Sequence, residues 1–126
     1  MSARFEELDY RPTAIGAVSL RRRHDPVLGE TVLEIKLDDE FLMSSAFTAS
    51  EKALARLGLA AAHGGALSVV VGGLGLGYTA KAVLDDPAVE SLFVIDFLAP
   101  VIEWHRSGLI PLGADLMADP RCHFVE

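Results

Sequence analysis

Hydrophobic and polar residues alternate along the first part of the chain. In residues 33–37, Leu-Glu-Ile-Lys-Leu, every second side chain is apolar, which is the period of a half-exposed β-strand. Turn-forming residues interrupt the alternation at Asp25-Pro26, at Gly29 and at Asp38-Asp39. The pattern between about residues 15 and 45 therefore predicts a small antiparallel β-meander.

A helical pattern follows the meander. Thr48 and Glu51 have the spacing of a capping box, in which each side chain bonds the other residue's backbone. Leu54, Leu57 and Ala61 recur at helical spacing and predict one apolar face. The glycines that follow His63 are expected to end this helix.

From Ala66 onward the pattern becomes that of alternating strands and helices. Residues 67–71 are nearly all apolar, which predicts a strand covered on both faces. A helix over 78–84, a strand over 92–95, a short helix opened by Pro100 and a strand over 122–125 are expected to follow. The fold class is thus α/β, with a meander over residues 1–47 and a Rossmann-like parallel sheet over residues 48–126.

A glycine-rich turn directly follows the first of these α/β strands. Gly73-x-Gly75-x-Gly77 suits an adenosylmethionine-binding turn, whereas Gly75-x-Gly77-x-x-Ala80 has the form found in dinucleotide-binding proteins. Glycines let a backbone approach a ligand closely. The alternative is a plain strand-to-helix turn.

An acidic residue, Asp96, ends the second strand of this α/β region. A carboxylate there can accept hydrogen bonds from ribose hydroxyls, because open α/β sheets bind ligands at the carboxyl ends of their strands. The alternative is that Asp96 caps the next helix. Together the glycine turn and this acid predict binding of an adenosine-type cofactor.

Composition excludes several other classes. The formal net charge of −7 leaves no basic surplus for coating nucleic acid; the one basic run, Arg21-Arg22-Arg23, is interpreted as a solvated hairpin end. The single cysteine, Cys122, permits neither an internal disulfide nor a cysteine zinc site. Because residues 1–10 lack a signal-peptide pattern and no membrane-spanning run occurs, we expect a cytoplasmic protein with no membrane partner and no metal.

Other chemistry-bearing residues have simpler interpretations. The four histidines are scattered and are interpreted as surface or structural groups. Trp104 is interpreted as helix packing rather than as a platform for an adenine. The acidic pairs at residues 38–39 and 85–86 are explained by turn chemistry.

Over most of its length, and chiefly between residues 70 and 96, the chain resembles the polyamine aminopropyltransferases, the spermidine synthases and their relatives. The resemblance rests on Gly72-Gly73, on Asp86-Pro87-Ala88-Val89-Glu90, on Phe93-Val94-Ile95-Asp96, and on Asp119-Pro120-Arg121 before the last strand. It implies a class I methyltransferase-type fold preceded by a β-hairpin domain. The cofactor implied is S-adenosylmethionine or its decarboxylated form. The implied cofactor-binding residues are Gly73, Leu74, Gly75, Gly77, Asp96 and Phe97.

The resemblance also implies a transferase that moves an aminopropyl or methyl group to an amine-type acceptor such as a polyamine. Leu74-Gly75-Leu76 stands where synthases commonly carry an aspartate, and Ser50-Glu51 where they commonly carry a Tyr-His pair. These departures argue against polyamine synthesis, but they leave the prediction of an adenosyl cofactor unchanged.

The family's catalytic acid would lie beyond Glu126, so the catalytic residue is unknown and the chain is expected to be an inactive fragment of a larger enzyme. Without a fourth strand, Val69-Val70-Val71 would form an open sheet edge, which predicts a homo-oligomer. Two other function classes remain open. One is an NAD(P)-dependent oxidoreductase domain, and the other is a non-catalytic cofactor-binding module.

Overall fold

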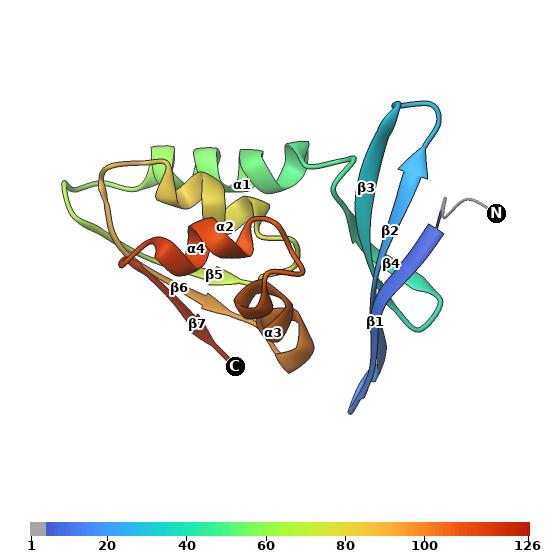
Figure 1. Cartoon of the computed structure of the whole chain (residues 1–126). Coiled ribbons are helices and arrows are strands. Elements are labelled where there is room, and N and C mark those ends of the chain that lie inside the picture. The colour runs from blue at the N-terminus through green and yellow to red at the C-terminus, as the bar shows by residue number, and fades with distance from the viewer. Residues whose placement is uncertain (1–4) are drawn as a thin grey trace. The chain divides into compact units, whose positions relative to one another are not determined.

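The computed structural model describes residues 5–126, and it divides the chain into one unit that ends at Phe47 and a second that runs from Thr48 to Glu126. The strands are β1 (Phe5–Thr13), β2 (Gly16–Asp25), β3 (Glu30–Leu37), β4 (Glu40–Ser44), β5 (Leu67–Gly72), β6 (Val89–Ile95) and β7 (Cys122–Val125). The helices are α1 (Ala49–Ala61), α2 (Tyr78–Leu84), α3 (Ala99–Ser107) and α4 (Gly113–Ala118) (Figure 1). The sequence analysis predicted that residues 1–10 are not a signal peptide. Residues 1–4 of that segment lie outside the described residues.

The first unit is an antiparallel sheet in the order β1-β2-β3-β4, which confirms the predicted meander. Alternation places Val18 and Leu20 of β2 and Val32 and Ile35 of β3 in its core. The turn predicted at Asp38 forms as well. Asp38 adopts a left-handed φ of 52° and accepts a hydrogen bond from the Ala17 amide.

The basic run does not form a solvated hairpin end. Arg21 and Arg23 lie within β2, and the Nε atom of each donates to the same oxygen of Glu34, at 2.8 and 3.0 Å. Glu34 is only 3% exposed. A carboxylate is stable at that depth only when it is paired, so the two arginines complete the core of the meander.

The second unit is a parallel sheet in the order β5-β6-β7. Figure 1 shows its helices gathered on one side of this sheet. Apolar residues of the sheet and of the helices meet there: Val71, Leu92 and Val94 from the strands and Ala80, Val83, Val101, Trp104 and Leu116 from the helices. No described residue of the second unit covers the other face of the sheet, and Val70 on that face is 63% exposed. The prediction that β5 is covered on both faces is therefore wrong for the described part of the chain.

Helix α1 begins where it was expected but turns a different face inward. Ala55 is its buried residue, whereas Leu54 and Leu57 are exposed, because the small Ala55 side chain lets α1 approach α2 closely. Thr48 is the N-cap residue but forms no side-chain capping bond, so the predicted capping box is absent from this helix start. Among the described residues, no helix has the length and apolar character needed to cross a membrane.

Candidate functional site

The glycine-rich turn joins β5 to α2 and is shaped by three left-handed residues. Gly73, Gly75 and Gly77 have φ angles of +100°, +51° and +93°, which residues other than glycine rarely adopt. The Gly73 amide donates to the carbonyl of Ile95 at 2.7 Å and so ties the turn to the end of β6. Gly77 is the N-cap residue of α2.

Asp96 lies directly after β6 and is half-buried. Its Oδ2 accepts a hydrogen bond from the Leu74 amide at 2.8 Å, and its Oδ1 accepts one from the Leu98 amide, also at 2.8 Å. The carboxylate therefore faces the glycine turn. Its second bond reaches the amide of Leu98, the N-cap residue of α3, and α3 has no side-chain capping bond, so the interpretation of Asp96 as a helix cap is wrong. Each oxygen still has a lone pair that can accept a further hydrogen bond.

The glycines of the turn serve two different purposes. At Gly72 and Gly73 an added Cβ would meet nothing within 4 Å, and both residues are exposed, so the backbone is open to an approaching group. At Gly77 an added Cβ would lie 2.9 Å from Cε1 of His105 and 3.0 Å from a methyl group of Leu116. Gly77 is thus required by packing inside the protein, and ligand approach is confined to the first part of the turn.

The two leucines of the turn point into the protein. Leu74 and Leu76 are buried, which anchors the turn against the core. Leu74 therefore faces the candidate site with its backbone rather than with its side chain. Phe97, by contrast, is 68% exposed beside Asp96.

One buried polar residue beside the turn was not among the predicted site residues. His105 of α3 is 1% exposed, and its Nε2 lies 2.7 Å from the carbonyl oxygen of Gly75. A single histidine in a short helix that also carries Glu103 and Arg106 is a weak signal, and nothing in the sequence spacing connects it to a glycine 30 positions earlier. Only the fold brings the two together.

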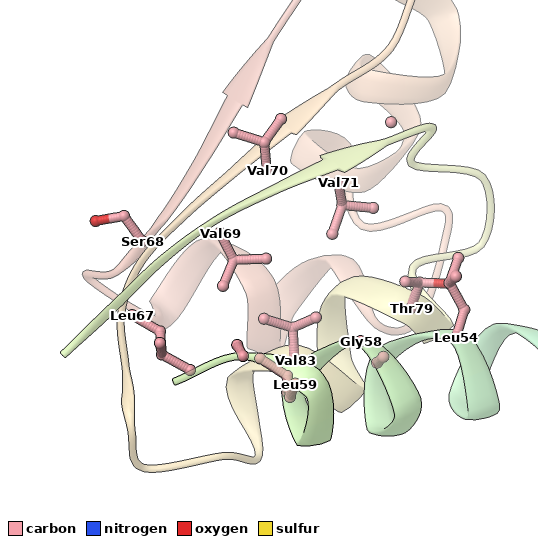
Figure 2. Close-up of a pocket in the computed structure, with 13 residues that line it drawn as sticks. Leu54, Gly58, Leu59, Leu67, Ser68, Val69, Val70, Val71, Thr79 and Val83 are labelled. Carbon is pink, nitrogen blue, oxygen red and sulfur yellow. The ribbon is translucent and has the colours of Figure 1, made fainter. Parts of the chain in front are cut away.

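A groove of about 400 Å³ lies between α1 and the free edge of β5 and reaches as far as Gly72. Figure 2 shows Val69 and Val71 pointing towards α1 and α2, with Val70 on the opposite side of the strand. The groove is lined mainly by aliphatic side chains, among them Leu54, Leu59 and Val83. No charged side chain is among its lining residues.

The remaining candidates have structural roles. Trp104 is buried in the core, which confirms the packing interpretation. The acidic pair at residues 85–86 belongs to a turn, where Asp86 Oδ1 accepts the Ala88 amide at 2.8 Å. Burial raises the pKa of the Cys122 thiol to about 11, so it is protonated at neutral pH and unreactive. Within residues 5–126 no group of three metal-ligating side chains comes together.

No family model matches this chain, and no curated protein matches it either. Solved structures do match. They include a crystal structure of spermidine synthase from Thermotoga maritima and one of spermidine synthase in complex with the transition state analogue AdoDATO. Each has a TM-score of 0.71 at 22% identity, over 94% of this chain and 39% of the matched chain.

The chain has a spermidine synthase-like fold. This agrees with the predicted α/β class, an antiparallel hairpin sheet followed by the first strands of a methyltransferase-type sheet. The chain spans about two fifths of the length of these solved structures, 39%.

Proposed function

We propose that this chain binds the adenosyl cofactor of a spermidine synthase-like transferase, which moves an aminopropyl or methyl group to an amine-type acceptor. The observation that carries the proposal is the contact between Asp96 and the Leu74 amide at the carboxyl ends of β5 and β6. Ligands of open α/β sheets bind at that end of the strands.

The residues present fit an adenosyl group. The exposed backbone at Gly72 and Gly73 leaves room for a ligand to lie against it without meeting a side chain. Asp96 is already oriented by two backbone amides, so its remaining lone pairs need no reorganisation to accept the two hydroxyls of a ribose. Preorganised acceptors of this kind bind more tightly than mobile ones.

The cofactor would supply a sulfonium centre, whose neighbouring carbon is open to displacement by an amine. The contribution of this chain would be to fix that centre in place, since alignment of the reacting atoms supplies much of the rate in such reactions. S-adenosylmethionine would support methyl transfer and its decarboxylated form aminopropyl transfer. The formal net charge of −7 favours a cationic acceptor such as a polyamine over an anionic one.

The first test is titration calorimetry of the chain with S-adenosylmethionine, with decarboxylated S-adenosylmethionine and with NADH. We expect one of the two adenosyl sulfonium compounds to bind. The substitution Asp96→Asn should weaken that binding roughly tenfold or more, because hydrogen bonds to a charged acceptor contribute about 1.5–3 kcal/mol.

Asp86→Asn is the matched control. Like Asp96, Asp86 accepts a backbone amide two residues further on, but it lies in the turn after α2, away from the glycine turn. Its substitution should leave cofactor affinity unchanged. Binding of NADH in place of both sulfonium compounds would instead support the oxidoreductase alternative, and binding of none of them would refute the proposal.

A further inference from the structure

We infer that His105 is a positioning residue for the glycine turn, holding the Gly75 carbonyl so that the turn keeps its cofactor-binding shape. The effect on cofactor binding rests on the proposed function, whereas the contact between His105 and Gly75 is part of the structure whatever the function is. The ring nitrogen Nε2 lies 2.7 Å from the Gly75 oxygen, and this contact is buried.

The chemistry of the contact fixes the state of the ring. A carbonyl oxygen can only accept a hydrogen bond, so Nε2 must carry the proton and donate it. In the neutral ring Nδ1 is then unprotonated. His105 Nδ1 is also buried and has no hydrogen-bond partner among the described residues.

That unpartnered nitrogen argues against a role in packing alone. Burying a polar atom without a partner destabilises a protein, and an aliphatic side chain of similar size would fill the same space without that cost. The histidine is therefore explained by its one donated bond. The carbonyl that receives it belongs to the middle glycine of the turn.

The surroundings hold the ring on that carbonyl. Gly77 lies against the ring, since a Cβ added there would be 2.9 Å from its Cε1 atom, and the same Cβ would be 3.0 Å from a methyl group of Leu116. The ring of Phe124 in β7 approaches the imidazole edge-on, with the ring centroids 5.9 Å apart. Gly113 of α4 packs directly against the His105 backbone carbonyl, where there is no room for a side chain. The imidazole is thus confined by α2, α4 and β7.

Within the turn the Gly77 amide donates to the Leu74 carbonyl, and three further contacts tie the turn to neighbouring residues. The Gly73 amide donates a hydrogen bond to the Ile95 carbonyl, and the Leu74 amide donates one to the Asp96 carboxylate. The His105 ring donates one to the Gly75 carbonyl. The first two fix the part of the turn that is open to a ligand. The third holds the Gly75 carbonyl and so helps to set the direction of the Gly75–Leu76 peptide.

The experiment compares His105→Gln, whose amide can donate over a similar reach, with His105→Met, which fills similar volume but has no donor. We expect His105→Met to bind S-adenosylmethionine, or the decarboxylated form if that is the ligand, roughly tenfold more weakly than wild type, because a buried carbonyl loses its partner. We expect His105→Gln to restore most of the affinity. Equal affinity of all three proteins would overturn the inference.

Two spectroscopic measurements separate this inference from the proposed function. Nitrogen NMR of the histidine rings should show one ring in the Nε2–H form at neutral pH. Amide hydrogen exchange at Gly75 and Leu76 should be faster in His105→Met than in His105→Gln, after correction for the global stability of each variant. If the wild type binds neither sulfonium compound but these two results hold, the proposed function fails while the positioning of the turn by His105 is supported. Protonation of the His105 ring on Nδ1 would overturn the inference itself. Equal amide exchange rates at Gly75 and Leu76 in the two variants would overturn it as well.

Discussion

At the scale of single residues, one carboxylate and one imidazole organise the candidate site. Asp96 joins the glycine turn to the start of α3, and His105 reaches the same turn from within α3. The sequence predicted the meeting of Asp96 with the turn, because a strand end and the preceding strand-to-helix turn share one edge of a parallel sheet. The sequence could not predict the position of His105, whose contact depends on how α3 packs.

The burial of His105 predicts a dependence of stability on pH. Burial lowers the pKa of His105 below its ordinary value of 6.5, although the bond to the Gly75 carbonyl and the charge of Asp96 raise it. The unfolded chain therefore binds this proton more readily than the folded one. The stability that the neutral ring contributes is complete above the unfolded pKa of 6.5 and is lost as the pH falls below it towards the folded pKa.

The measurement is urea unfolding at neutral pH and at about pH 5, where this linkage acts. The decrease in unfolding free energy on acidification should be smaller in His105→Gln than in wild type. The pKa values of Asp25 and Asp119 are lowered from 3.8, by backbone hydrogen bonds in one case and by Arg121 in the other, so their contribution is lost in a separate and more acidic range. An equal decrease in both proteins near pH 5 would contradict the assignment to His105.

At the scale of elements, the strands and the longer helices follow from local patterns, and their packing does not. Helix α2 has the predicted bounds of residues 78–84, because an apolar helical pattern is enclosed between a glycine and an Asp-Asp-Pro turn. Helix α4 was missed, since six residues after a proline give too little periodicity to detect. The inward face of α1 was wrong because contact with α2, rather than the largest side chains, decides which face is buried.

The junction between the glycine turn and α2 gives a test of the two glycine roles. Gly73→Ala adds a methyl group in open space at a φ of +100°, so it should cost about 1–2 kcal/mol in unfolding free energy from backbone strain alone. Gly77→Ala adds similar strain at a φ of +93° and also forces the methyl group against His105. Overpacking typically costs a further 1–3 kcal/mol or so.

Urea denaturation of the two variants provides the comparison. Gly77→Ala should be the less stable protein, and the difference between the two should match the overpacking term. Similar stabilities would mean that the ring of His105 yields easily, and would argue against its being confined.

At the scale of the whole molecule, the second unit has an apolar sheet face and an apolar groove without a partner among the described residues. Val70, Phe93, Ile95 and Val125 are exposed on that face, and β5 offers a free edge with no charge or proline to protect it. Contiguous apolar surface and unprotected edge strands both favour association. We therefore expect the 126-residue chain to self-associate in solution.

Light scattering tests this expectation with a matched pair of substitutions. Val70 and Leu57 are both 63% exposed, but Val70 lies on the uncovered sheet and Leu57 on α1 outside the groove. Val70→Lys should shift the chain towards the monomer, whereas Leu57→Lys should leave its association unchanged. A wild-type chain that is already a uniform monomer would refute the expectation.

The sequence by itself determined most of the strands and helices, though not β1 or α4, as well as the meander before a parallel sheet and the pairing of a glycine turn with an acid at the strand ends. These features depend on residues close in sequence, through hydrophobic period, turn chemistry and strand direction. Tertiary structure alone decided that Arg21 and Arg23 enclose Glu34, that Gly77 makes room for an imidazole, and that one face of the sheet is uncovered. Each of these features depends on how whole strands and helices pack against one another, which places residues far apart in the sequence next to each other or leaves a surface without a neighbour.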